Sequence, residues 1–218
     1  MDMTGRSVRA EQVRVTRELI RSTAERLFAE RGVYAVSNRQ ISEAAGQGNT
    51  AVVGYHFGTK TDLVRAIARH HAERIERVSR RLLAETGDST DLRDWVACLV
   101  RPTPEYLAES GNPTWYARFC AQVMADPALH EILVAETLDL PVWRQILDDL
   151  HRCLPDLPAE VRAERTSMTR NVILYTCAER ERALALNTPT PRASWHDAAD
   201  GLVDAIVGLW TAPVTESS

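Results

Sequence analysis

The sequence predicts an all-α fold, in which a small N-terminal three-helix unit precedes a larger helical body, with about nine helices in all. Three observations lead to this prediction. Apolar residues recur at helical spacing along most of the chain. Helix caps and glycine stops follow one another closely between residues 32 and 63. Prolines then separate the later helical segments.

The first 31 residues divide into an arm and a helix. Residues 1–10 are predicted to form a flexible basic arm that carries Arg6 and Arg9. Such an arm can follow a phosphate backbone or enter a minor groove, and a solvated tail is an equal alternative. Apolar positions recur at helical spacing over residues 11–31, and Gly32 supplies the stop. The apolar positions of this first helix are Ile20, Ala24, Leu27 and Phe28.

The next segment contains a compact signal for a helix start. Ser37 can cap the free amides of a helix N-terminus while Gln40 reaches back to the Ser37 amide, which together make a capping box. Val36 and Ile41 occupy the two positions of a hydrophobic staple. The second helix is therefore predicted to begin at this box and to end at Gly46.

A third and a fourth helix follow directly. The third helix is predicted to begin near Asn49 or Thr50, which are both good caps, and to end at Gly58. Thr59 then caps a fourth helix, with Asp62 three residues later, and this helix is predicted to run to about residue 84. Two short helices joined by a glycine turn are typical of the helix-turn-helix, which places its second helix in the DNA major groove.

The remaining chain consists of amphipathic segments separated by polar or proline-containing breaks. The polar residues 85–90 mark a boundary, and Pro141 is predicted to kink or split a long helix that opens at Pro127. Helices are predicted over residues 91–100, 105–109, 115–125, 127–153, 159–186 and from 194 onward. The domain organisation is thus an arm (1–10), a helix-turn-helix domain (11–58), a connecting helix (59–84) and a body (85–218).

The last two helices are each predicted to turn one apolar stripe inward. Ser194 caps the final helix, with Asp197 at the third position. The predicted stripes are Val161, Met168, Val172 and Tyr175 in the first helix, and Trp195, Ala198, Leu202, Ala205, Ile206 and Leu209 in the second. Two such helices can pair with their mates in a four-helix dimer interface, or they can simply close the core of one chain.

Composition limits the class of protein. Residues 1–80 carry 14 Arg and Lys against 9 Asp and Glu, whereas residues 81–218 carry 12 against 21. A basic N-terminal third on an acidic remainder fits a DNA-binding module attached to a body that DNA repels, although chance can also produce this asymmetry. No apolar run approaches the roughly 20 residues of a membrane span, and the N-terminus lacks a signal-peptide pattern, so a cytoplasmic protein is expected.

The sequence contains no signature of catalysis or of a metal site. The cysteines Cys98, Cys120, Cys153 and Cys177 are widely separated, and no G-x-S-x-G, P-loop or H-E-x-x-H motif occurs. We therefore expect neither an enzyme nor a cofactor.

The N-terminal quarter resembles the DNA-binding domain of the tetracycline-repressor family of bacterial regulators. The matching residues are Thr23–Phe28, Gly32, Val36–Ser37, Ile41, Ala44–Gly46 and Tyr55–Leu63. The resemblance implies a homodimeric transcriptional repressor that binds a palindromic operator in double-stranded DNA, one half-site per subunit. It also implies dimerisation through the last two helices and release of DNA by a small apolar or amphipathic effector. A ligand-independent regulator or an activator of the same fold, and a helical protein-binding adaptor, remain alternatives.

The resemblance also implies which residues meet DNA. The expected contact residues are Ser37, Asn38, Arg39, Gln47, Gly48, Asn49, Thr50, Tyr55, His56 and Lys60. Helix capping is the alternative for Asn49 and Thr50, and packing in the small domain's core is the alternative for His56. Among them, Ser37 and Lys60 are expected at phosphates, because a hydroxyl with free helix amides, or an ammonium, suits an anion. This chain departs from the family at Gly54, where the family usually has an aromatic residue, and the segment before Phe57 is one residue longer. Tyr55 is expected to take over that phosphate contact.

The aromatic residues of the body are candidates for an effector pocket. The predicted ligand-binding residues are Trp95, Tyr106, Trp115, Tyr116, Phe119, Met124, Trp143 and Tyr175. An aromatic stripe packs a core as readily as it lines a pocket, so core packing is the alternative for each of them. The polar residues Arg118, Gln122, His130 and Arg144 can orient a ligand or lie on the surface.

Overall fold

The structure is a computed structural model that describes residues 3–137 and 140–215. Within these two ranges the chain forms eleven helices and no strand, which confirms the all-α prediction. The helices are α1 (Met3–Arg31), α2 (Asn38–Ala44), α3 (Val52–Phe57), α4 (Lys60–Thr86), α5 (Leu92–Val100), α6 (Pro102–Glu109), α7 (Tyr116–Met124), α8 (Pro127–Thr137), α9 (Pro141–Arg152), α10 (Ala159–Ala185) and α11 (Trp195–Thr211).

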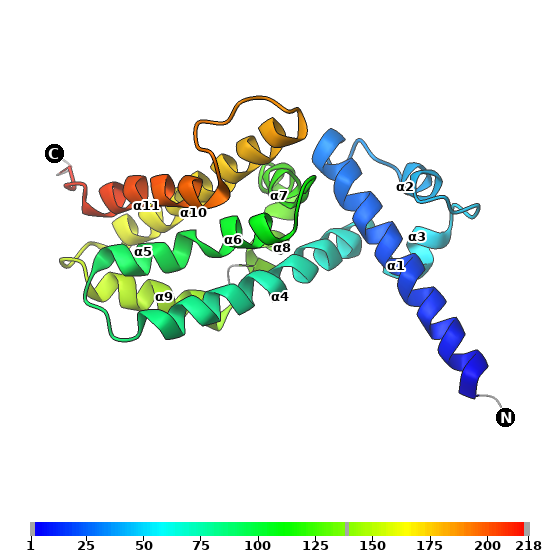
Figure 1. Ribbon diagram of the computed structural model, residues 1–218, viewed down its shortest axis with the longest axis horizontal. Helices are drawn as coiled ribbons and strands as arrows, with labels where there is room; N and C mark the ends of the chain where they lie inside the picture. The colour runs from blue at the N-terminus through cyan, green and yellow to red at the C-terminus, as the bar shows by residue number, and fades with distance from the viewer. Residues whose placement is uncertain (1–2, 138–139, 216–218) are drawn as a thin grey trace.

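The helices form two groups that α4 connects. Figure 1 shows α1, α2 and α3 at one end of the molecule and the helices from α5 to α11 at the other. The N-terminal end of α4 packs with the first group, and the rest of this helix runs through the second. Helix α7 contacts both α1 and α10, so it is a second bridge between the groups. Helices α4 and α7 therefore both connect the body to the N-terminal unit.

Local chemistry sets the helix starts that the sequence predicted. Capping boxes are present at Ser37, Thr59 and Ser194, and each hydroxyl accepts a hydrogen bond from the backbone amide three residues later. Gly46 and Gly58, with φ of 65° and 79°, end α2 and α3 in a conformation that side chains rarely adopt. These positions confirm the predicted order of α2, α3 and α4.

Two predicted starts are wrong. Helix α1 begins at Met3, so residues 3–10 are helical where a flexible arm was predicted, and Arg9 is exposed on that helix. No proline interrupts this segment, so the helix continues towards the N-terminus; the side chain of Arg6 lies outside the described side chains. Helix α3 begins only at Val52, because Asn49 accepts a hydrogen bond from the Ala51 amide and forms a turn instead of a helix cap.

Pro141 splits the helix that was predicted to run from Pro127 to Cys153 into α8 and α9. No helix within the described ranges has the length and apolarity that crossing a membrane requires.

The predicted inward stripe of α10 is wrong for the single chain. Met168 and Tyr175 are 44% and 45% exposed, and Val161 and Val172 are only partly buried. The helix instead buries charged side chains. Arg165 donates to the carbonyl oxygens of Trp210 (2.6 Å) and Ala212 (2.6 Å), and therefore ties α10 to the end of α11. Met168 and Tyr175 therefore face outward in the single chain, whereas Cys177 and Ala178 are buried in its core.

The stripe of α11 is partly correct. Leu202 and Ile206 are buried, whereas Trp195, Ala198 and Leu209 are half-buried and Ala205 is exposed. The small residues Ala205 and Gly208 lie on the exposed side of this helix.

Candidate DNA interface and effector cavity

The N-terminus of α2 presents an exposed, well-ordered cap. The Gln40 amide donates to Ser37 Oγ (3.2 Å), and the Ser37 amide donates to Gln40 Oε1 (2.8 Å). Ser37 and Arg39 are exposed, and Arg39 pairs with Glu43 on the next turn (2.7 Å). The Oδ1 atom of Asn38 is buried, so its side chain is less accessible than predicted. This helix start offers a hydroxyl, amides and a guanidinium to an anion.

The turn before α3 and the outer face of α3 are also exposed. Gly48, Asn49 and Thr50 are accessible, whereas Gln47 is half-buried and donates through its side chain to the Ala45 carbonyl (3.1 Å). Tyr55 is 82% exposed, as expected for a side chain that meets a partner.

Helix α3 has a buried inner face and an exposed outer face, and Gly54 lies on the outer one. Val53 and Phe57 pack into the core, and His56 is half-buried with its ring 5.1 Å from that of Tyr55. A Cβ atom at Gly54 would meet no atom within 4 Å, so the glycine leaves an open place on the outer face.

Lys60 makes an internal contact that the sequence did not predict. Its Nζ atom donates to the carbonyl oxygens of Val36 (2.6 Å) and Val33 (3.2 Å), so it holds the start of α4 against the loop before α2. Partial burial lowers the pKa of this ammonium. An ammonium has three donors, so these two bonds leave one for a phosphate. Lys60 thus fixes the position of the α2 N-terminus relative to α4.

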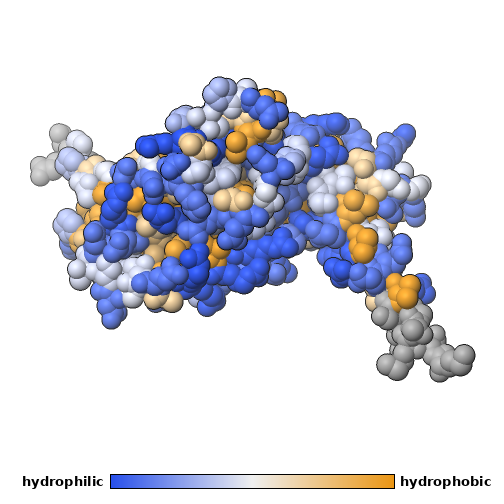
Figure 2. All heavy atoms as spheres, in the orientation of Figure 1, coloured by the Kyte–Doolittle hydropathy of each residue, from blue (hydrophilic) through white to orange (hydrophobic). Residues whose placement is uncertain are grey.

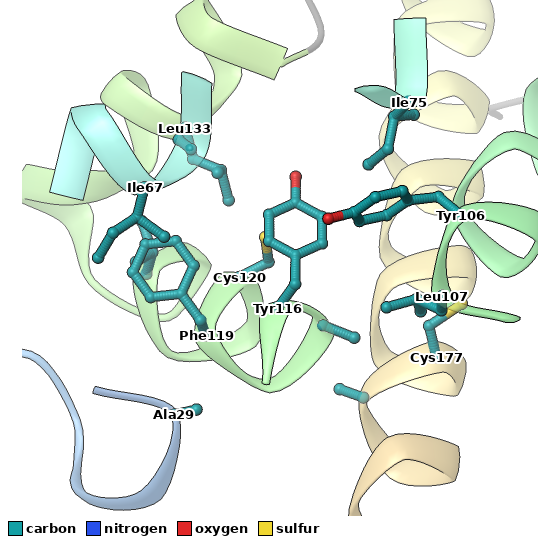
Figure 3. Close-up of a cluster of buried hydrophobic side chains, with 14 of the residues drawn as sticks. Ala29, Ile67, Ile75, Tyr106, Leu107, Tyr116, Phe119, Cys120, Leu133 and Cys177 are labelled. Atoms are coloured by element: carbon teal, nitrogen blue, oxygen red, sulfur yellow. The ribbon is translucent and has the colours of Figure 1, made fainter. Parts of the chain in front are cut away.

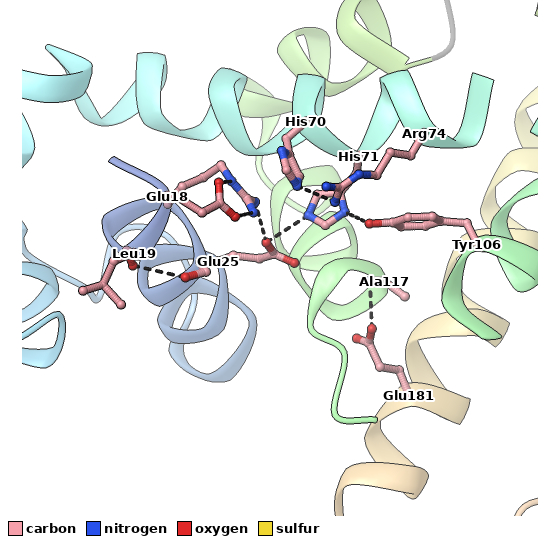
Figure 4. A network of polar contacts seen from close by, with 11 residues as sticks. Glu18, Leu19, Glu25, His70, His71, Arg74, Tyr106, Ala117 and Glu181 are labelled. Carbon is pink, nitrogen blue, oxygen red and sulfur yellow. Dashed lines mark hydrogen bonds and ion pairs between the residues drawn. The ribbon is translucent and has the colours of Figure 1, made fainter. Parts of the chain in front are cut away.

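A buried polar network joins the N-terminal unit to the body (Figure 4). Glu25 of α1 lies 2.9 Å from His71 Nε2 on α4, and His71 Nδ1 lies 2.6 Å from the Tyr106 hydroxyl on α6. Arg21 donates to the same Glu25 oxygen (3.0 Å). The tautomer of the His71 ring decides which of these two contacts it donates and which it accepts. The His71 ring also stacks on Tyr116, with centroids 4.1 Å apart.

His70, the neighbour of this network, is half-buried and lies near Arg21. Its pKa is lowered to about 4, first because burial penalises the charged ring and then because Arg21 lies nearby. In the unfolded chain the ring titrates near 6.5. Between about pH 6.5 and pH 4, His70 binds a proton in the unfolded chain but not in the folded one. Proton binding therefore stabilises the unfolded state, and the free energy of unfolding decreases as the pH falls through this range.

Replacing His70 with glutamine is therefore expected to flatten the acid limb of the stability curve. Glutamine can still accept the hydrogen bond that Arg74 donates to the His70 ring, but it cannot be protonated. Urea unfolding at steps between pH 7 and pH 4 measures the effect, with the exposed residue His196→Gln as the control. Equal pH slopes for the wild type and His70→Gln would contradict this assignment.

The body contains a partly open cavity of about 630 Å³. This volume is within the range of pockets that bind drug-sized molecules. Its lining comes from α4, α5, α6, α7, α8, α9 and α10: Ala72, Ile75, Leu99, Thr103, Tyr116, Ala117, Cys120, Met124, His130, Glu131, Leu133, Val134, Ala135, Trp143, Leu147, Thr166, Thr169, Arg170, Ile173 and Leu174. Figure 3 shows the Tyr116 ring projecting into the space bounded by Leu133, Ile75 and Tyr106.

Three of the predicted ligand-binding residues line this cavity, namely Tyr116, Met124 and Trp143. His130, which the sequence left open as a polar contact, lines it as well. The pKa of Tyr116 is raised well above its ordinary value because the hydroxyl is buried, so this group remains a neutral hydrogen-bonding group.

The other five predicted residues lie outside the lining. Trp95 packs in the core and donates to the Ser89 carbonyl (2.9 Å), while Phe119 stacks on Phe28 of α1. Tyr106 belongs to the polar network. The remaining two are Trp115, whose ring lies under the Arg118 guanidinium, and Tyr175, which faces outward.

Sequence reasoning missed the polar wall that α10 contributes. Thr166, Thr169 and Arg170 follow the helical spacing of one face, together with Ile173 and Leu174, and all five line the cavity. The spacing is visible in the sequence, but it does not distinguish a cavity wall from a solvated helix face.

Comparison with known proteins agrees with this arrangement. Residues 20–67 match the family model described as bacterial regulatory proteins of the tetR family, and residues 97–208 match the tetracyclin repressor-like C-terminal domain. No curated protein sequence matches the chain. A solved structure of the multidrug binding protein EbrR, in complex with imidazole, is similar at 20% identity and a TM-score of 0.52, over 91% of this chain and 97% of that one.

Two further solved structures share the fold. One is a putative TetR-family transcriptional regulator from Mesorhizobium loti, with 14% identity and a TM-score of 0.52 over 90% of this chain and 97% of that one. The other is the TetR-family transcriptional regulator PfmR from Thermus thermophilus, with 12% identity and a TM-score of 0.50 over 91% of this chain and 97% of that one. Because the C-terminal family model alone spans more than half of the 218 residues, and the N-terminal model adds the helix-turn-helix, the chain belongs to the tetracycline-repressor family of DNA-binding transcriptional regulators and is not an enzyme.

Proposed function

We propose that the protein is a cytoplasmic repressor that binds a palindromic operator as a homodimer and releases it when a small apolar or amphipathic effector enters the cavity. One observation carries this proposal. Helix α4 lines the cavity with Ala72 and Ile75, and the same helix begins at Lys60, which holds the loop before α2. A ligand that displaces the middle of α4 therefore also moves the helix-turn-helix.

The polar network gives this coupling a second route. Tyr116 lines the cavity and stacks on His71, and His71 is hydrogen-bonded to Glu25 in α1. A ligand that moves the Tyr116 ring acts on His71 and hence on the angle between α1 and α4. Release of DNA requires that the ligand binds the DNA-incompetent arrangement more tightly than the DNA-bound one.

The exposed face of α10 and α11 supports a dimer. Met168 and Tyr175, which are exposed on α10, lie on the same stripe as Val172, and the small residues Ala205 and Gly208 are exposed on α11. Small residues allow close helix approach, and an apolar stripe that the core leaves uncovered marks an interaction surface. Paired with its mate, this face would form a four-helix interface.

The DNA-binding residues are proposed as predicted from the sequence, with three refinements. Asn38 and Gln47 contribute less, because their side chains are partly buried. Tyr55 is the principal contact on the outer face of α3. Lys60 acts both on the loop carbonyls and on a phosphate.

Single substitutions test the docking. Arg39→Ala and Lys60→Met are each expected to weaken the affinity for a duplex selected from random DNA about three- to tenfold. Each should also reduce the magnitude of the slope of log binding constant against log salt concentration by about one, because one phosphate contact is lost. Arg152→Ala is the matched control, since Arg152 is as exposed as Arg39 and pairs with Asp149 in the body. Fluorescence anisotropy across a salt series measures both quantities. Unchanged affinity and slope in both variants would overturn the docking, and a wild type without any salt slope would favour the protein-binding adaptor.

A further inference from the structure

One wall of the effector cavity carries polar atoms that nothing in the described part of the chain satisfies. Thr169 is 4% exposed, and its Oγ1 atom is buried without a hydrogen-bond partner among the described residues. The Nε atom of Arg170, the next residue, is also buried and without a partner. Both residues line the cavity from α10. A buried polar group that lacks a partner is costly, so it indicates a missing ligand group.

Arg170 places a positive charge at this wall. Within the described ranges, its guanidinium makes one hydrogen bond, from Nη2 to Ser167 Oγ (3.0 Å), and no ion pair. Burial lowers the pKa of this guanidinium, because desolvation penalises the charged form. Glu131 is the acidic residue of the lining, but it is exposed and does not pair with Arg170. Among the described residues, the charge at the cavity wall therefore has no counter-ion.

The rest of the lining is mostly apolar. Ile173 and Leu174 continue the α10 wall beyond Arg170, while Met124, Trp143 and Leu147 line the cavity from α7 and α9. A ligand that complements both the polar wall at Thr169 and Arg170 and the apolar part of the lining has one anionic end and an apolar remainder.

We propose that the effector is an amphipathic anion, such as a fatty or aromatic acid. Its headgroup oxygens accept hydrogen bonds from Arg170 Nε and the Thr169 hydroxyl, and its apolar part lies against Trp143 and Met124. Guanidinium and carboxylate or sulfonate groups form charge-assisted bonds that are stronger than neutral ones. A cation would repel Arg170, and a neutral apolar molecule would leave the Arg170 charge and the Thr169 hydroxyl unsatisfied. The proposal rests on the proposed function only in assigning this cavity to the effector.

A pair of fluorescent dyes tests the charge preference directly on the full-length protein without DNA. 8-Anilinonaphthalene-1-sulfonate and N-phenyl-1-naphthylamine share one apolar framework, and only the first carries an anionic group. We expect the sulfonate to bind saturably, with one molecule per chain, and at least tenfold more tightly than the neutral dye. Dodecanoate should displace it, whereas dodecyltrimethylammonium should not.

Variants locate the effect at the α10 wall. Arg170→Met is expected to reduce the affinity for the sulfonate at least tenfold and to leave the affinity for the neutral dye within twofold. Thr169→Val, which keeps the shape of the side chain, should reduce the affinity for the sulfonate two- to fivefold. Arg182→Met is the control, because Arg182 is exposed on the same helix and does not line the cavity.

Equal binding of the two dyes by the wild type, no saturable binding of the sulfonate, or full sulfonate affinity in Arg170→Met would each overturn the anion proposal. If Arg170→Met does not fold, the ratio of the two dye affinities in the wild type and the sulfonate affinity of Thr169→Val still test the anion proposal. None of these outcomes touches the repressor proposal, which depends on operator binding, so the two can fail separately.

Discussion

Glu181→Ala is expected to lower the free energy of unfolding by about 3–5 kcal/mol, because it leaves a buried arginine without its counter-ion. The Glu181 side chain is fully buried on α10, and its carboxylate accepts from Arg118 Nε (3.2 Å). The same carboxylate accepts from the backbone amides of Arg118 (2.9 Å) and Ala117 (3.3 Å) in the first turn of α7 (Figure 4). Glu181 is thus both an ion-pair partner and a cap for the helix that bridges α10 and α1.

Urea unfolding at one fixed protein concentration measures this loss. Glu181→Gln should lose less stability than Glu181→Ala, because an amide oxygen still accepts hydrogen bonds. Glu179→Ala, an exposed neighbour on the same helix, should change stability by no more than about 0.5 kcal/mol. Equal unfolding curves for Glu179→Ala and Glu181→Ala would show that the Arg118–Glu181 pair contributes nothing to the free energy of unfolding.

The double variant Met168→Asp with Tyr175→Asp is expected to be monomeric and to bind a palindromic operator about 100-fold more weakly or worse. The two side chains lie on the exposed face of α10. Aspartates in an apolar helix interface would be buried without partners, whereas on the surface of a monomer they are solvated. A monomer engages only one half-site and loses the effective concentration that links the two recognition helices.

Sedimentation and anisotropy, measured on the same samples, check both parts of this prediction. Met168→Leu with Tyr175→Phe keeps the apolar surface and should remain dimeric with unchanged operator affinity. A dimeric aspartate variant would place the interface elsewhere on the molecule. Figure 2 shows separate apolar spots on the end of the molecule that α1 occupies. Val8, Val15 and Leu19 are exposed at the spacing of one face of α1, and this would be the next surface to examine.

Helix starts were predictable because they depend on a few neighbouring residues. The hydroxyls of Ser37, Thr59 and Ser194 bond to amides three residues later, so sequence and structure carry the same information. Asn49 shows the limit of this reasoning. Its side chain satisfies the Ala51 amide in a turn, which competes with the cap that was predicted.

The burial pattern of α10 was not predictable from helical spacing. This helix buries Arg165 and Arg180, whose guanidinium groups bond to carbonyl oxygens in distant segments. Periodicity of apolar residues identifies an apolar face, but it does not say whether that face meets the same chain or another one. Met168 and Tyr175 belong to the predicted stripe but are exposed in the single chain, so helical spacing alone did not identify the buried face of α10.

The cavity residues were only partly predictable for a related reason. Tyr116 and Phe119 lie on the same helix and are both buried, yet one lines the cavity and the other stacks on Phe28. An aromatic side chain has the same sequence signature in both environments. Polar lining residues such as Arg170 become distinguishable only when the structure shows what their polar atoms lack.

Selection of binding sites from a pool of random duplex DNA tests the central claim most directly. The full-length protein should enrich a palindrome whose half-site centres are separated by about 10 base pairs, or a multiple of this, because two recognition helices must reach successive major grooves on one face. Affinity for the enriched duplex should fall steeply with salt concentration. Enrichment of a single half-site without symmetry, or of no sequence at all, would contradict the account of this protein as a dimeric operator-binding regulator.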